Sequence, residues 1–273
     1  MATIRENAFA GKPVGAAVID AHCHLLPYRN IAWYQAYDSI PDILSHMDDL
    51  GILCAVNAPH TLILGEMRRT NAVAKEVIRA YPGRFYGYIA IVPTEGMDAV
   101  KEQIRLYADD PCFVGLKLLP GYHGSLLQDE YHYALDFAQE ACCPVLTHKW
   151  GTAPGTDEVR AHMQKRPGLK LLIAHLGGGS AEYTDQIAEV MRDYPNIKME
   201  LCGSMSNTYS VEDVVSIIGE DRLVYGSDLI NIEPKYDFGR VAFSPIDDAV
   251  KRKIFADNYL AMMDGSQMGK ILL

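Results

Sequence analysis

Short apolar runs alternate along this chain with longer segments in which apolar residues recur at helical spacing. Runs rich in Val, Ile and Leu and bounded by turn residues are typical of strands that are buried on both faces. The sequence contains eight such runs: Ala17–His22, Ile52–Asn57, Tyr86–Val92, Phe113–Leu118, Pro144–His148, Lys170–His175, Ile197–Leu201 and Leu223–Asp228.

The segments between the runs predict amphipathic helices, because their apolar residues fall on one face. These segments are Pro41–Leu50, Asn71–Tyr81, Met97–Ala108, Glu130–Cys142, Asp157–Lys165, Ala181–Tyr194, Val211–Ile218 and a closing helix Ile246–Met263. Ser39 is a suitable N-cap for the first helix and Gly51 a suitable stop. Eight repeats of strand and helix predict a parallel sheet closed into a single (β/α)8 TIM barrel, with residues 1–273 forming one domain.

A doubly wound open sheet is the second interpretation of the same alternation. That fold binds its cofactor through a glycine-rich turn after the first strand. Here Gly177-Gly178-Gly179 follows His175, late in the chain, and lacks the G-x-G-x-x-G spacing. The barrel is therefore preferred.

Charge and composition limit the kinds of molecule that this protein is expected to bind. The formal net charge of -10 and the pI near 5.3 argue against a nucleic-acid or anionic-membrane surface, which needs clustered Lys and Arg. No run approaches the roughly twenty apolar residues that span a bilayer. The six cysteines are scattered through apolar segments and are interpreted as reduced. We expect a cytoplasmic protein that acts on a small molecule, and a homo-oligomer is compatible with the sequence.

Polar residues stand at the carboxyl ends of the predicted strands. His22 and His24 are spaced i, i+2, so on a strand both imidazoles point to the same face and can bind one metal ion. The other residues at strand ends are Lys117, His148, His175 and Asp228. In a barrel these ends form one rim, where active sites of this fold lie. Because these polar groups would need partners once buried together, we predict a Zn²⁺-like ion among them. The other histidines, His46, His60, His132 and His162, are interpreted as structural.

Five motifs at these strand ends combine apolar residues with a metal-binding or charged side chain. They are Ile19-Asp20-Ala21-His22-Cys23-His24, Gly115-Leu116-Lys117-Leu118, Val145-Leu146-Thr147-His148, Ala174-His175-Leu176-Gly177-Gly178 and Tyr225-Gly226-Ser227-Asp228. Their order and spacing resemble the amidohydrolase superfamily. More narrowly, they resemble its amidohydrolase-related branch, which includes metal-dependent hydrolases, lactonases and aminocarboxymuconate-semialdehyde-type decarboxylases. The resemblance implies that His22, His24 and Asp228 are metal ligands, with His148 and His175 as further ligands or substrate-facing groups.

The chemistry of such a site follows from its ligands. A Zn²⁺ ion held by neutral imidazoles and a carboxylate lowers the pKa of a bound water to about 7. Asp228 can accept the proton of that water and pass it to a leaving group, while His175 can polarise a substrate carbonyl. We therefore expect a metal-dependent hydrolase of a small ester, lactone or amide, with Asp228 and His175 as catalytic residues.

Two other functions stay open. The alternative is a metal-dependent decarboxylase of a carboxylated aromatic or semialdehyde substrate, which releases CO₂ where a hydrolase does not. The third is a barrel that binds metal or ligand without catalysis, although Asp228 is a base that binding alone would not require.

Lys117 decides how many metal ions are expected. In some members of the superfamily a lysine at the end of the fourth strand is carboxylated and bridges two metals. A lysine paired with an aspartate or a substrate carboxylate is the plainer interpretation, so we expect one ion, most simply zinc, and an unmodified Lys117 that also contacts substrate. Arg29, Lys149 and Trp150 lie in loops after strands and are further candidates for binding a substrate that bears a carboxylate.

Overall fold

Eight parallel strands form the centre of the molecule. The computed structural model describes residues 2–25, 39–149, 153–178, 180–203 and 209–271. The strands pair in sequence order, each parallel to the next. They are β1 Val18–Cys23, β2 Ile52–Asn57, β3 Phe85–Ile91, β4 Phe113–Leu118, β5 Pro144–Thr147, β6 Lys170–Ile173, β7 Ile197–Leu201 and β8 Leu223–Tyr225. A parallel bridge between Cys23 and Leu229 joins the two ends of the sheet.

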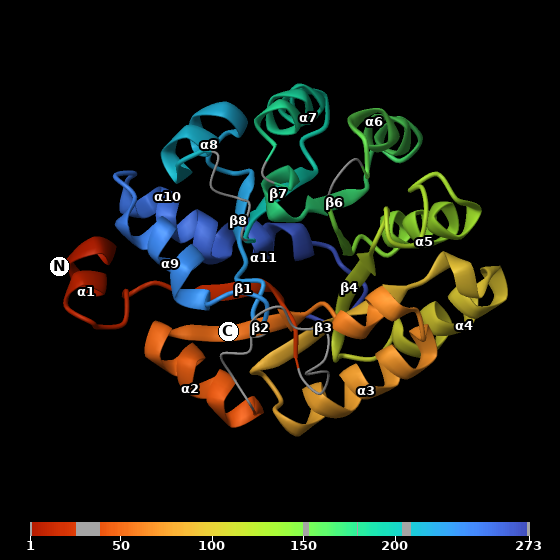
Figure 1. The fold of residues 1–273 in the computed structure, drawn as a ribbon, viewed down its shortest axis with the longest axis horizontal. Helices are drawn as coiled ribbons and strands as arrows, with labels where there is room; N and C mark the ends of the chain where they lie inside the picture. The colour runs from red at the N-terminus through yellow and green to blue at the C-terminus, as the bar shows by residue number, and fades with distance from the viewer. Residues whose placement is uncertain (1, 26–38, 150–152, 179, 204–208, 272–273) are drawn as a thin grey trace.

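Helices surround this ring of strands (Figure 1). The longer ones are α2 Ile40–Leu50, α3 Met67–Ala80, α4 Met97–Tyr107, α5 Asp129–Glu140, α6 Thr156–Lys165, α7 Ala181–Asp193, α8 Val211–Ile218 and α9 Pro234–Phe243. Shorter elements are α1 Ile4–Phe9, η1 His60–Leu64, η2 Pro93–Glu95, η3 His175–Gly177, α10 Asp248–Arg252, the π-helical turn η4 Lys253–Asp257 and α11 Asn258–Met263. The chain is thus a single (β/α)8 TIM barrel, and the predicted fold class is confirmed.

The element boundaries show why the sequence pattern was informative. Ser39 caps α2 by accepting a hydrogen bond from the backbone N–H of Asp42, and Gly51 ends the helix with a left-handed φ of 71°. The closing helix predicted over Ile246–Met263 is divided into α10, η4 and α11, whereas α1 and α9 were not predicted.

The core lies on both faces of the strands. Apart from Leu53, Lys170 and Lys198, every strand residue is buried. A large hydrophobic cluster joins the strands to the helices. A smaller one joins strand residues such as Tyr88 and Leu172 to Tyr259 of the C-terminal segment. In the part of the chain that the structure describes, no helix is both long and apolar enough to cross a membrane.

Candidate metal centre

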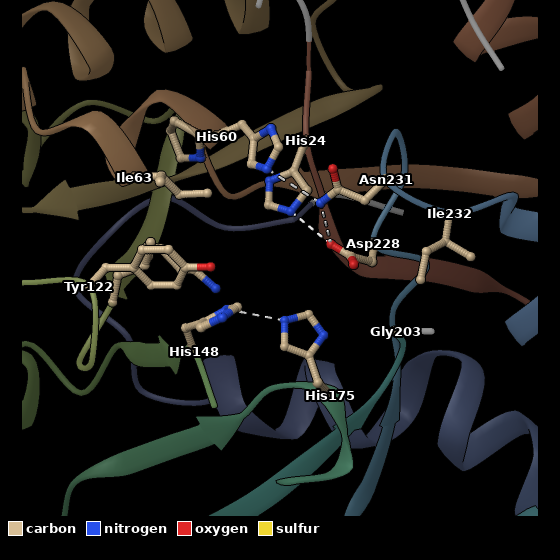
Figure 2. Close-up of a pocket in the computed structure, with 13 residues that line it drawn as sticks. His24, His60, Ile63, Tyr122, His148, His175, Gly203, Asp228, Asn231 and Ile232 are labelled. Atoms are coloured by element: carbon tan, nitrogen blue, oxygen red, sulfur yellow. Dashed lines mark hydrogen bonds and ion pairs between the residues drawn. The ribbon is translucent and has the colours of Figure 1, made fainter. Parts of the chain in front are cut away.

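The predicted rim residues other than His22 line one pocket at the carboxyl ends of the strands. The pocket has a volume of about 390 Å³. Its polar lining comprises His24, His60, Lys117, His148, His175, Asp228 and Asn231, and its other lining residues are Pro59, Ile63, Leu119, Tyr122, Gly203 and Ile232. Figure 2 shows His24 and Asp228 on one side of this pocket and the His148–His175 pair on the other.

Several of these side chains stand just beyond the strands rather than on them. The structure ends β5 at Thr147, β6 at Ile173 and β8 at Tyr225, earlier than the sequence predicted. His175 and Asp228 then adopt left-handed backbone angles, with φ of 61° and 53°. The backbone N–H of Asp228 donates to the carbonyl of His22 at 2.9 Å, which ties the segment after β8 to β1.

His24 and Asp228 form a pair that needs a cation. The Nδ1 of His24 contacts the carbonyl oxygen of Ala58, which can only accept, so Nδ1 carries a proton. In the neutral ring Nε2 is then a lone pair, yet it faces the Oδ1 of Asp228 at 2.8 Å. Two acceptors at this distance require a proton or a metal ion between them. The pair therefore fits a metal site.

The imidazoles opposite this pair are neutral. The Nε2 of His175 lies 3.1 Å from the Nδ1 of His148. Burial and the nearby positive charge of Lys117 lower the pKa of His175 to about 4, although the charge of Asp228 opposes the shift. Burial and the neighbouring His175 lower the pKa of His148 well below its ordinary value. Neutral imidazole is the form that binds metals.

Asp228 is held in its ionised form. Burial alone would raise the pKa of this carboxyl. The hydrogen bond from His24 in its protonated form, and the positive charges of His175 and His24 when they are protonated, outweigh burial, and the net pKa lies well below the ordinary value. Asn231 adds a hydrogen bond by donating its Nδ2–H to Oδ1 at 3.1 Å.

Glu200, at the end of β7, was missed by the sequence analysis. Its Oε2 accepts from the Nδ1 of His22 at 3.1 Å, the thiol of Cys202 at 2.9 Å and the backbone N–H of His175 at 3.3 Å. Glu200 is fully buried, and burial raises its pKa well above the ordinary value. A carboxylate one residue before the carboxyl end of the strand was the available signal.

Gly226 makes room for this carboxylate. A Cβ atom at position 226 would lie 2.1 Å from the Oε1 of Glu200 and 3.0 Å from the Cβ of His22. Only glycine lets Glu200 pack beside His22 in this arrangement. The Tyr225-Gly226-Ser227-Asp228 motif therefore contributes both a carboxylate and the space that positions the first histidine.

Four buried residues offer ligand atoms that all lie within 4.8 Å of one another: His22, His175, Cys202 and Asp228. Three of them were predicted as ligands, and Cys202 was not. Neutral nitrogen, sulfur and carboxylate donors in a buried cluster are the set that a divalent transition metal binds.

Lys117, on β4, lines the pocket. Its Nζ is 3.5 Å from the Nε2 of His22, and only 2% of the residue is exposed. Burial lowers its pKa to about 8, against the opposing charges of Glu200 and Asp228. At neutral pH the side chain is therefore still mainly an ammonium.

The remaining candidates have different outcomes. Arg29 and Trp150 lie outside the residues that the structure describes. Lys149 is buried with its Nζ 4.3 Å from the ring centre of Tyr183, and it is not among the residues that line the pocket. His60, interpreted as structural, instead lines the pocket and stacks on His24 with ring centres 4.5 Å apart.

Comparison with known proteins places this barrel in a family. The model of the family described as Amidohydrolase matches residues 19–261. The chain therefore belongs to the amidohydrolase family, and the predicted resemblance to its aminocarboxymuconate-semialdehyde-decarboxylase-like branch is confirmed. The comparison with curated proteins found no match.

Solved structures with the same barrel include three decarboxylases. A 2,6-dihydroxybenzoate decarboxylase from Rhizobium has a TM-score of 0.69 and 16% identity, over 92% of this chain and 98% of that one. A dihydroxybenzoic acid decarboxylase from Polaromonas, with bound manganese and 2-nitroresorcinol, has a TM-score of 0.66 and 16% identity, over 92% and 97%. A 5-carboxyvanillate decarboxylase from Novosphingobium aromaticivorans, with bound manganese, has a TM-score of 0.69 and 15% identity, over 92% and 97%.

These findings correct the leading functional prediction. The sequence analysis preferred a hydrolase of esters, lactones or amides, with Asp228 as the proton carrier of a metal-activated water. The reactions named for the three structures above are decarboxylations, so this preference was wrong and the stated alternative is better supported. The physical reason is that the ligand set does not specify the bond that breaks. The same metal cluster can hold a water for attack or the carboxylate of a substrate.

Proposed function

We propose that this protein is a metal-dependent decarboxylase of a small aromatic acid. The observation that carries the proposal is the pocket. Its lining includes the ammonium of Lys117, the cluster residues His175 and Asp228, and an apolar wall of Ile63, Leu119 and Tyr122. A cationic end fits a carboxylate, and an apolar wall fits a ring. Its volume of about 390 Å³ suits one ring with small substituents.

The proposed metal site holds one divalent ion. His22, His24 and Asp228 bind it, with His148 and His175 as further ligands or substrate-facing groups. When bound, the ion would orient the substrate carboxylate and withdraw electron density from it. Lys117 stays unmodified in this proposal, because its ammonium pairs with the substrate carboxylate and a second ion would repel it.

The chain's own residues then have separate tasks. Lys117 binds the carboxylate, and the apolar wall excludes water from the ring. The bond between the ring and the carboxyl group breaks with its electron pair left on the ring carbon, and CO₂ leaves. The same carbon must receive a proton. Asp228 and His175 line the pocket and are the residues proposed to take this proton from solvent and pass it to the carbon.

A panel assay in D₂O tests this function. Purified protein loaded with Zn²⁺ or Mn²⁺ is given hydroxylated benzoates, lactones and amides, and both CO₂ release and hydrolysis are followed. We expect CO₂ from at least one aromatic acid, with one deuterium on the carbon that lost the carboxyl group, and no reaction after metal removal. Hydrolysis of a lactone or amide without CO₂ release from any acid would show that the proposal is wrong.

A further inference from the structure

Cys202 lies inside the cluster of candidate ligands, but the predicted ligand set does not include it. It follows β7 directly and is fully buried. Its Sγ lies 3.2 Å from the Nδ1 of His175 and 3.5 Å from the Nδ1 of His22. Among the described residues it belongs to the group of four whose ligand atoms could surround one ion.

These separations are close to those around a single metal ion. Four-coordinate Zn²⁺ binds sulfur at about 2.3 Å and nitrogen at about 2.0–2.1 Å, which places sulfur and nitrogen ligands roughly 3.6 Å apart. The Sγ–Nδ1 distance to His175 is slightly shorter, so a small outward movement of Cys202 would fit an ion. The Nδ1 of His22 donates to Glu200, so His22 would bind the ion through Nε2. Hydrogen bonds to sulfur also have such lengths, and the experiment below separates the two arrangements.

Glu200 gives the thiol proton a place to go. The thiol of Cys202 donates to the Oε2 of Glu200 at 2.9 Å. Binding of sulfur to a metal ion would break the S–H bond, and the proton would move to the Oε2 of Glu200 in its ionised form, with no change in oxidation state. The transfer leaves the net charge of the buried site unchanged, so it avoids placing a new unpaired charge in the core.

We propose that Cys202 binds the metal ion as a thiolate, with Glu200 as the acceptor of its proton. The consequence is metal preference. Thiolate favours Zn²⁺ and Co²⁺, whereas manganese prefers oxygen ligands. We therefore expect this site to select Zn²⁺ over Mn²⁺, although manganese is bound in two of the similar structures.

Cobalt substitution gives a direct readout of a sulfur ligand. This inference rests on the metal centre of the proposed function but not on decarboxylation. Metal-free protein is titrated with Co²⁺, and absorption is recorded in the near ultraviolet, where sulfur-to-cobalt charge transfer appears. We expect the band in the wild-type protein and its loss in Cys202→Ser. Cys54→Ala is the matched control, because Cys54 is buried in the smaller hydrophobic cluster, and it should keep the band.

Metal affinities provide the second readout. Competition with a chelator should show that Cys202→Ser lowers Zn²⁺ affinity by about 10–100-fold or more, and Mn²⁺ affinity by a smaller factor. If the variant does not fold, X-ray absorption of the zinc-loaded wild type should show a sulfur neighbour at about 2.3 Å.

The outcomes separate the two proposals. Bound cobalt or zinc without a sulfur signal overturns the role of Cys202 and leaves the metal centre intact. A sulfur signal that persists in Cys202→Ser also overturns it. If neither metal binds, the metal centre and the role of Cys202 both fail, whereas the CO₂ assay tests decarboxylation by itself.

Discussion

His24 and Asp228 show how single residues define this site. Each presents an acceptor to the other at 2.8 Å, because the backbone of Ala58 fixes which nitrogen of His24 carries the proton. A proton or a metal ion must therefore lie between the two atoms, and the arrangement is one that two ligands sharing a cation would adopt.

The first prediction concerns Asp228→Asn. The variant amide can donate its N–H to the lone pair of His24, so the pair no longer needs a cation and the fold should be kept. It also loses the carboxylate charge and cannot carry a proton. We expect weaker metal binding, and at matched metal occupancy a fall in CO₂ release of roughly 10²–10⁴-fold.

Elemental analysis and circular dichroism accompany that assay, so that loss of metal and loss of fold are measured separately. Turnover near the wild-type rate at equal occupancy would show that Asp228 does not carry the proton.

At the scale of elements, neighbouring segments pack closely against one another at the carboxyl ends of the strands. Glu200 at the end of β7 packs where Gly226, after β8, has no side chain. Through its hydrogen bond to His22, this contact sets the orientation of a candidate ligand. The site therefore depends on the packing of β7 against β8 as well as on the ligands themselves.

Gly226→Ala tests this dependence. The new methyl group would overlap the carboxylate of Glu200, which must move and lose its bond to His22. Overpacking of this kind costs about 1–3 kcal/mol of unfolding free energy, and metal affinity should fall with it. Gly239→Ala is the control, because a Cβ in helix α9 meets nothing closer than 3.6 Å. It should be neutral or stabilising in the same denaturant titrations, and equal effects of the two variants would contradict the packing argument.

Helix α6 carries a separate, structural histidine. The Nε2–H of His162 donates to the carbonyl of Leu126 at 3.0 Å, and its Nδ1 accepts from Arg166 at 3.1 Å. Burial lowers the pKa of His162 to about 4, with the bond to Leu126 opposing the shift. The unfolded chain, in which the pKa is about 6.5, therefore binds this proton more tightly than the folded protein does.

This difference predicts a loss of stability in acid. The contribution of neutral His162 is complete above pH 6.5 and is lost as the pH falls toward about 4, by an amount on the order of 3 kcal/mol. His162→Gln can make both hydrogen bonds and does not titrate. Between pH 6.5 and 4, the unfolding free energy of the variant should fall less steeply with pH than that of the wild type. The two slopes should differ by the equivalent of about one bound proton. Near pH 8 the difference in unfolding free energy between the two proteins should stay constant. Parallel curves over the acid range would contradict this assignment.

For the whole molecule, the sequence pattern was sufficient for the barrel but not for the whole site. Apolar strands alternating with amphipathic helices have few other ways to pack, so the ring of eight could be predicted. The site depends on contacts between segments far apart in sequence. Glu200 resembles an ordinary strand carboxylate until its bonds to His22 and Cys202 are seen, and His60 resembles a structural histidine until it stacks on His24. Lys149 was expected at the substrate but contacts Tyr183.

The position of the candidate ligands relative to the hydrophobic core predicts how the protein responds to metal removal. The hydrophobic clusters bury side chains from the strands, the helices and the C-terminal segment, and the candidate ligands lie at one end of the barrel. Chelation should therefore leave far-ultraviolet circular dichroism unchanged but lower the midpoint of thermal unfolding. At a metal concentration of about 100 times Kd, binding adds about 2.7 kcal/mol. For a chain of this length that amounts to a shift in the unfolding midpoint of roughly 5–10 °C.

Adding Zn²⁺ back should restore the midpoint, whereas Ca²⁺, which prefers oxygen ligands, should not. If chelation unfolds the protein, the fold itself depends on the ion, and the ion is not only bound in the pocket. Equal stabilisation by Ca²⁺ would mean that the histidines are not the ligands.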